Sequence, residues 1–304
     1  MIPPALPPAV VAADAPTPAH PEAAIVTRFA PPLGRAVRYE TRRTVALDSG
    51  PATFAMVQEL RFGAAQPGYA LDLRTISAEA EGPADVTAGF LASMNAFRRI
   101  AVRYRVRDDG TPEAVEDLDG VWAALIAAAA QAPAPAGPSG DLVRGLVVAL
   151  RAYPAEARTA ALLEGPRMIL GFAPPTLAPG LVAPFSGQAA TPQGPAVPIA
   201  GTVRVAGANA ATVRFAIDAT ASEAAMTQAA AMLRAAAAQL PGERGAAALA
   251  AADRLATLRL LERTELVVDR KTGLAERIER RVLMVAPDGT ETEHLRETTV
   301  RRDG

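Results

Sequence analysis

The chain has no cysteine in its 304 residues, which excludes disulfides, thiolate nucleophiles and thiolate-bound zinc within it. Only two histidines are present, His20 in a proline-rich stretch and His294 near the end. His294 lies in an alternating segment, where we expect it on the solvent face of a strand. With no second histidine nearby, a zinc site cannot be completed. We therefore predict no metal site and no cofactor.

Sequence motifs of catalysis and phosphate binding are also missing. The chain contains no G-x-S-x-G, no S-x-x-K and no G-x-x-x-x-G-K motif. Its carboxylates alternate with arginines, as in the run from Glu276 to Arg281. That alternation is typical of cross-strand ion pairs on a wetted sheet face. We predict that the protein is not an enzyme.

The charge balance gives no general attraction to polyanions, because the net charge is −1 and Lys271 is the only lysine. One basic stripe is present, and acidic residues follow it closely, so we predict no binding to nucleic acid. The stripe consists of Arg98, Arg99, Arg103, Arg105 and Arg107. No apolar run approaches the ~20 residues that span a bilayer, so we predict no transmembrane segment.

Residues 1–33 are rich in proline and alanine and predict a disordered leader. The stretch Ala13 to Ala15 resembles a cleavage site, and such leaders often tether a domain after a signal has been removed. A periplasmic or cell-envelope location follows from this interpretation, and a floppy terminus in the cytoplasm is the alternative.

From residue 35 onward, apolar and polar residues alternate over long segments separated by turn residues. We expect strands over 35–47, 53–62, 69–81, 199–205, 211–219, 263–269, 274–285 and 290–301, and more strands in the hairpin described next. Helical patterns cover 85–97, 119–131, 141–152, 155–163 and 222–261, the last interrupted at Pro241. The segment 172–198 is rich in proline and glycine and is expected to wrap over the surface.

A strand-turn-strand pattern occurs twice, at 99–115 and at 263–278. Aligning Gly110 with Gly273 also aligns Val115 with Ile278. In both copies two alternating segments and an alanine-rich helical stretch come first. The sequence thus predicts an α+β fold with about ten strands: a large curved antiparallel sheet, or incomplete barrel, with helices packed on one face and a duplicated ββ-α-ββ half.

We predict a single domain over 34–304. Its pseudo-repeats cover 34–131 and 196–302, and a helical and loop insert covers 132–195. Two packed domains are the alternative.

Apolar residues that share one face of the first strands are the candidate ligand-binding residues, because a bent sheet covered by helices can enclose an apolar cavity. The alternative is that they only pack against the helices. These residues are Phe54, Met56, Leu60, Phe62, Leu71, Leu73, Val102 and Tyr104.

Two antiparallel blocks, inserted helices and the late hairpin Val267 to Leu274 resemble bacterial envelope proteins with the Lol-type (LolA/LolB-like) lipoprotein-carrier fold. The closest local match is the Asp269-x-x-Thr-Gly273 turn, and the loop Pro174 to Gly180 also recurs in uncharacterised relatives of that type. The resemblance implies an incomplete barrel plugged by helices around a hydrophobic cavity. It implies no particular binding residue.

The function predicted from the sequence is a non-catalytic envelope protein that binds a lipid or acyl chain inside a half-barrel. An interaction module that docks a partner protein through the outer sheet face or an edge strand is the alternative.

Overall fold

The computed structural model describes residues 27–47, 49–98, 100–131, 138–170, 177, 180–191, 196–238 and 242–302. Most of the predicted leader, including Ala13 to Ala15 and His20, lies outside the described residues. So do residues 132–137 and most of the loop from Pro174 to Gly180.

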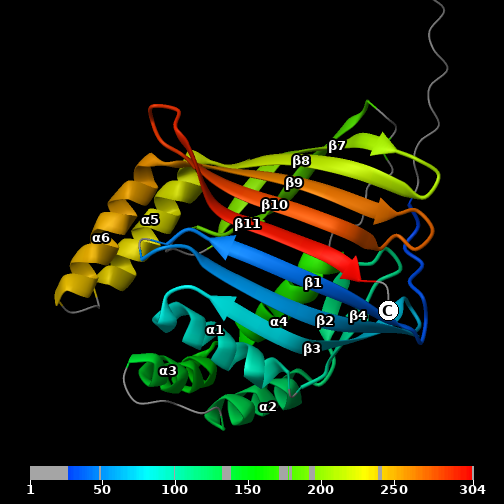
Figure 1. The fold of residues 1–304 in the computed structure, drawn as a ribbon, viewed down its shortest axis with the longest axis horizontal. Helices are drawn as coiled ribbons and strands as arrows, with labels where there is room; N and C mark the ends of the chain where they lie inside the picture. Colours follow the sequence, from blue (N-terminus) through cyan, green and yellow to red (C-terminus); the bar gives the residue numbers. More distant parts are fainter. Residues whose placement is uncertain are drawn as a thin grey trace, which may run out of the picture.

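In the described part of the chain, eleven strands form one antiparallel sheet that does not close into a barrel (Figure 1). This confirms the predicted α+β class and the large curved antiparallel sheet. The order across the sheet is β5-β4-β3-β2-β1-β11-β10-β9-β8-β7-β6. The strands are β1 (Ala36–Val45), β2 (Ala52–Ala64), β3 (Tyr69–Glu81), β4 (Val102–Val106), β5 (Pro112–Val115), β6 (Val182–Ala189), β7 (Val197–Ala208), β8 (Thr212–Ala221), β9 (Arg259–Asp269), β10 (Ala275–Val285) and β11 (Glu291–Arg302).

Six helices accompany the sheet in the described residues. They are α1 (Ala84–Phe97), α2 (Leu118–Ala130), α3 (Pro138–Ala152), α4 (Ala155–Leu170), α5 (Glu223–Ala237) and α6 (Gly242–Thr257). Helices α1, α2 and α3 pack against one another beside β3, and α5 and α6 form a pair at the other side. Helix α4 passes behind the sheet in the view of Figure 1 and touches both β5 and β10.

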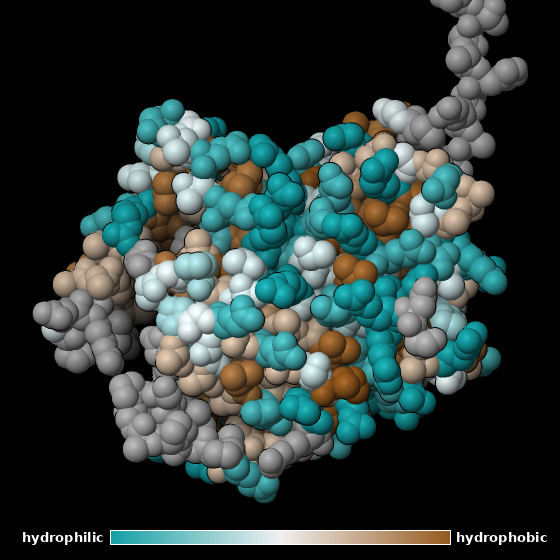
Figure 2. All heavy atoms as spheres, in the orientation of Figure 1, coloured by the Kyte–Doolittle hydropathy of each residue, from teal (hydrophilic) through white to brown (hydrophobic). Residues whose placement is uncertain are grey.

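Strict alternation along the strands separates a buried face from a wetted one. In β4, Val102, Tyr104 and Val106 are buried while Arg103 and Arg105 are exposed. Successive side chains of a strand point to opposite faces, so this pattern places the apolar set toward the helices and the arginines toward water. Figure 2 shows hydrophilic side chains gathered over the strands on the outer face.

Both halves of the sheet follow the same order of elements. One runs β2, β3, α1, β4, β5, and the other runs β7, β8, the α5–α6 pair, β9, β10. The matching turns contain Gly110 and Gly273, with φ of 89° and 69°, and both approach the segment before β1. The backbone N–H of Ala30 donates to the carbonyl of Thr272 at 2.9 Å, and the ring of Phe29 packs edge-on to Phe62. Residues 27–33, at the end of the predicted leader, therefore lie against both hairpins.

The segment 172–198, which was expected to wrap over the surface, contains a strand that the sequence analysis did not predict. Strand β6 pairs with β7 and forms one edge of the sheet. It includes Pro184 and Gly187, which disfavour an interior strand, but an edge strand tolerates proline because one of its sides has no ladder to complete.

Helix α4 is longer than the predicted 155–163. It runs through Gly165 and Pro166 to Leu170, and Pro166, Ile169 and Leu170 are buried. Burial of this apolar end offsets the ~3 kcal/mol that an interior proline costs a helix.

Candidate functional site

A cavity of about 140 Å³ lies between the buried face of β2–β4 and helices α1 and α4; we call it the β2–β4 cavity. Its strand wall consists of Met56, Gln58, Leu73, Thr75, Val102 and Tyr104. Its helix wall consists of Met94, Phe97, Ala161, Leu162, Gly165 and Pro166, and Ile100 completes the lining. The lining carries no ionisable carboxylate, amine, guanidinium or imidazole, so the walls are predominantly apolar.

Four of the eight residues that the sequence singled out line this cavity, namely Met56, Leu73, Val102 and Tyr104. The other four do not. Leu60, Phe62 and Leu71 are at most 1% exposed and belong to the packed core. Phe54 is half-buried, with its ring 4.8 Å from that of Phe90 in α1. The predicted set is thus divided between cavity wall and core.

Besides Thr75, Gln58 is a polar side chain of the strand wall that the sequence analysis missed. It stands between Met56 and Leu60 on the same face of β2 and is 7% exposed. Its side-chain oxygen Oε1 is buried and has no hydrogen-bond partner in the described residues. An unpaired buried carbonyl costs about 1–3 kcal/mol. A polar residue within an apolar register was the signal that could have identified it.

The hydroxyl groups of the two buried tyrosines near the cavity each donate a hydrogen bond to a backbone carbonyl. The hydroxyl of Tyr104 donates to the carbonyl of Leu162 in α4 at 3.1 Å, and that of Tyr39 donates to the carbonyl of Ala275 at 2.9 Å. Burial raises the pKa of both phenols well above their ordinary value, so both stay neutral. The hydrogen bond of Tyr104 also links β4 to α4.

Beside the cavity, the buried face of the central strands carries two ion pairs. Arg43 of β1 contacts Glu297 of β11 at 2.6 Å, and Arg280 of β10 contacts Glu262 of β9 at 2.5 Å. Glu297 and Glu262 are 4% and 3% exposed. Arg43 also reaches the sulfur of Met168 in α4 at 3.7 Å. These charges lie on the same face as the cavity, and they compensate one another instead of leaving a net charge.

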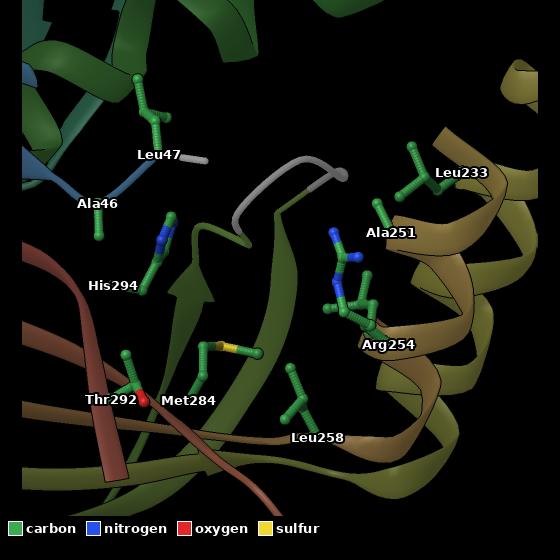
Figure 3. A pocket seen from close by; sticks show the side chains of 10 residues that line it. Ala46, Leu47, Leu233, Ala251, Arg254, Leu258, Met284, Thr292 and His294 are labelled. Atoms are coloured by element: carbon green, nitrogen blue, oxygen red, sulfur yellow. The ribbon is translucent and has the colours of Figure 1, made fainter. Parts of the chain in front are cut away.

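Another cavity, of about 230 Å³, lies between the β10–β11 end of the sheet and the α5–α6 pair (Figure 3). Figure 3 shows Met284, Thr292 and His294 on the strand side and Ala251 and Arg254 on the helix side. Leucines supply much of the rest of its wall: Leu47, Leu233, Leu255 and Leu258.

His294 is buried, so the prediction that it lies on the solvent face is wrong. The pairing of β10 with β11 shifts register between Val282 and Leu283, and His294 is the extra residue of this β-bulge. A bulge breaks the alternation of faces, so His294 and Leu295 are both buried. Burial lowers the pKa of His294, and a hydrogen bond with the backbone of Ala46 opposes this only in part.

The arginines of the predicted basic stripe that the structure describes on β4 and its turn are compensated by carboxylates. Arg103 pairs with Asp72 and Glu116, and Arg105 pairs with Glu113 at 2.9 Å. The pairs lie on the outer face of the sheet, where exposed ion pairs contribute little to stability.

Among the described residues, no group of three His, Asp or Glu side chains is arranged to hold a metal ion. Within the same residues, no helix has both the length and the apolar character needed to cross a membrane.

Comparison of the chain with protein-family models finds no matching family, and comparison with curated proteins finds no matching relative. The function is therefore inferred from the fold and from the β2–β4 cavity.

Proposed function

We propose that this protein is a non-catalytic binding protein that holds a hydrophobic ligand, such as a lipid or acyl chain, in the β2–β4 cavity. The observation that carries the proposal is a cavity with apolar walls between a curved open sheet and the helices that cover it. Ligand pockets are usually concave and apolar with few polar groups. Binding would be driven by burial of apolar surface, at about 25 cal/mol per Å².

The volume of the β2–β4 cavity limits the size of the ligand that can enter it. An apolar cavity of about 150 Å³ accepts benzene, so about 140 Å³ suits a ring of that size or a short chain segment. A longer lipid would place only one part of itself here, and the rest would lie outside the cavity.

Filling the cavity from α4 tests the proposal. A Cβ atom built on Gly165 would meet no atom within 4 Å, so Gly165→Leu puts a side chain into space that is open. Gly145 in α3 also has open space around its Cβ and is exposed, so Gly145→Leu is a matched control. Both changes raise helix propensity, so we expect both proteins to fold.

The probe is 1-hexanol, a neutral molecule with a short apolar chain, titrated by calorimetry. We expect the wild type and Gly145→Leu to bind it equally, and Gly165→Leu to bind it at least about tenfold more weakly, a difference of about 1.4 kcal/mol. Equal binding by all three proteins, or no binding by the wild type, would contradict the proposal.

A location in the bacterial envelope and kinship with Lol-type carriers are part of the same proposal. They are supported by the resemblance of the strand blocks and the late hairpin. Fractionation of cells that express the full precursor tests the location: recovery in the periplasmic or membrane fraction is expected, and recovery with the cytoplasmic marker would contradict it.

A second candidate function is docking of an extended segment of a partner protein along β6. Among the described strands β6 pairs only with β7, and Leu181 and Val182 at its start are 58% and 57% exposed. An edge strand offers backbone hydrogen bonds to an added strand. Val182→Lys should then abolish a partner complex seen by size exclusion while leaving 1-hexanol binding intact.

A further inference from the structure

Among the side-chain atoms of the described residues in the wall of the β2–β4 cavity, Oε1 of Gln58 is the fully buried polar atom that has no hydrogen-bond partner. Gln58 pairs across the sheet with Tyr39 on one side and Thr75 on the other, so its position on the buried face is fixed by strand register. A strand made only for packing would carry an apolar side chain here, as β2 does at Met56 and Leu60.

The neighbouring hydroxyls of the two tyrosines do not supply a proton to this oxygen. Tyr39 donates to the carbonyl of Ala275 and Tyr104 to that of Leu162. The amide oxygen can therefore be satisfied by a donor that arrives with the ligand, and a ligand without one leaves the oxygen unpaired.

The uncharged lining of the cavity also restricts the charge of the ligand group that can bind inside it. None of its lining residues is charged, so a carboxylate, phosphate or ammonium group inside it would be buried without a counter-charge. The part of the ligand that enters is thus neutral.

We propose that the β2–β4 cavity selects a neutral, mainly apolar group that carries one hydrogen-bond donor, a hydroxyl or an amide N–H, and that it places this donor against Oε1 of Gln58. This inference rests on the proposed function and narrows it. An aliphatic or aromatic alcohol or a secondary amide belongs to the class, and a pure hydrocarbon does not.

Phenol and toluene form the test pair, because they share a six-membered ring and one substituent of similar size, and only phenol has a donor. Water solvates phenol better than toluene, so a purely apolar cavity prefers toluene. We expect the wild type to bind phenol at least about tenfold more tightly than toluene, since a site that pairs a hydroxyl rejects the analogue that lacks it.

NMR spectra of protein labelled with ¹³C in its methionine methyl groups show where the probe binds. Met56 and Met94 line the β2–β4 cavity, Met284 lines the other cavity, and Met226 is a buried core residue of α5. Phenol should move the signals of Met56 and Met94 and leave those of Met284 and Met226 in place.

Gln58→Leu should reverse the preference, so that toluene binds more tightly than phenol, and Gln58→Met is a second variant for the same test. Thr299→Val is the control: it removes a hydroxyl from the buried face of β11, outside the cavity wall, and the preference for phenol should remain. Thr299 is 4% exposed, so the two positions are similarly buried.

The outcomes separate this inference from the proposed function. If the wild type prefers toluene while Met56 and Met94 respond, the cavity binds apolar ligands but the role of Gln58 is overturned. A response confined to Met284 overturns it as well. If neither phenol, toluene nor 1-hexanol shifts the methyl signals of Met56 and Met94, both the inference and the proposed function fail.

Discussion

At the scale of single residues, polar side chains on the buried face distinguish this molecule from a simple packed half-barrel. Besides Gln58, this face carries Thr41 and Thr299, whose hydroxyls are 2.9 Å apart, and the pairs Arg43–Glu297 and Arg280–Glu262. The threonines and the two carboxylates are buried and the two arginines are partly buried, all on the face where strand alternation calls for apolar side chains. Such groups are stable only when their partners are in place.

Loss of one charge from a buried pair tests that statement. We expect Glu262→Gln to lower the free energy of unfolding by about 3–5 kcal/mol, because the largely buried Arg280 loses the carboxylate with which it is in direct contact. Glu291→Gln breaks the exposed pair with Arg263 on the outer face and should cost less than about 1 kcal/mol. Urea denaturation measures the free energy of unfolding of both variants. Equal losses would show that the buried ion pair contributes no more to stability than the exposed one.

His294 should make stability depend on pH. Burial lowers its pKa in the folded state, so the neutral form is favoured on folding. The contribution of neutral His294 to the free energy of unfolding is fully present above the pKa of the unfolded state, about 6.5. It is lost as the pH falls toward the lower pKa of the folded state, and it amounts to about 1.4 kcal/mol for each unit by which the two pKa values differ.

We therefore expect the free energy of unfolding of the wild type to fall more steeply between pH ~7.5 and ~5.5 than that of His294→Gln. Denaturation curves at both pH values give the slopes. His20→Gln removes the other histidine and serves as the comparison. Parallel slopes for the wild type and His294→Gln would contradict the account.

The sequence allowed the apolar residues of the cavity wall to be predicted better than the polar ones. Met56 and Val102 follow directly from period-two alternation. Gln58 was passed over because it interrupts the apolar pattern, although alternation places it on that face. His294 was misplaced because a one-residue bulge changes the face of a strand, and no residue type marks the bulge.

At the scale of elements, the segment that precedes β1 joins the two matching hairpins. A Cβ built on Gly110 would lie 2.7 Å from the ring of Phe29, and one on Gly273 would lie 2.7 Å from the carbonyl oxygen of Arg28. The glycines are needed here for close approach as well as for their positive φ.

Gly110→Ala and Gly289→Ala separate these two requirements. Gly289 in the β10–β11 turn has φ of 88°, close to the 89° of Gly110, but its Cβ would meet no atom within 4 Å. We expect Gly289→Ala to cost about 1–2 kcal/mol from strain, and Gly110→Ala to cost about 1–3 kcal/mol more from the clash with Phe29.

Thermal and urea denaturation measure the two costs. In a Phe29→Ala background the extra cost at Gly110 should disappear, because the clashing ring is gone. If the two glycines cost the same in the wild type, the segment does not pack on the hairpin as described.

Elements with strong periodicity were predicted and those with mixed signals were not. The long strands and the glycine turns follow from local pattern. Strand β6 contains Pro184 and lies in the segment that was expected to wrap over the surface, and α4 was predicted to end at residue 163, before Gly165 and Pro166. In both cases tertiary structure overrides the local sequence preference. Strand β6 tolerates its proline because it lies at the edge of the sheet, and α4 continues because Ile169 and Leu170 are buried.

At the scale of the whole molecule, the sheet leaves its two edges, β5 and β6, unjoined, and helices cover its inner face. The fold class could be predicted because the same order of strands and helix occurs in both halves. The position of the predicted cavity could not be derived from the sequence, because it depends on how tightly α1 and α4 pack on the sheet and not on which residues face inward. Of the eight predicted residues, four therefore line the cavity, three belong to the core and Phe54 packs on α1.

The most direct test of the central claim is native mass spectrometry of the protein as purified, followed by organic extraction and analysis of what is released. We predict a stoichiometric apolar compound with a hydroxyl or amide N–H in the bound mass of the wild type, absent from Gly165→Leu. A clean mass without ligand, together with no gain in thermal stability from added phospholipids or alcohols, would contradict the account.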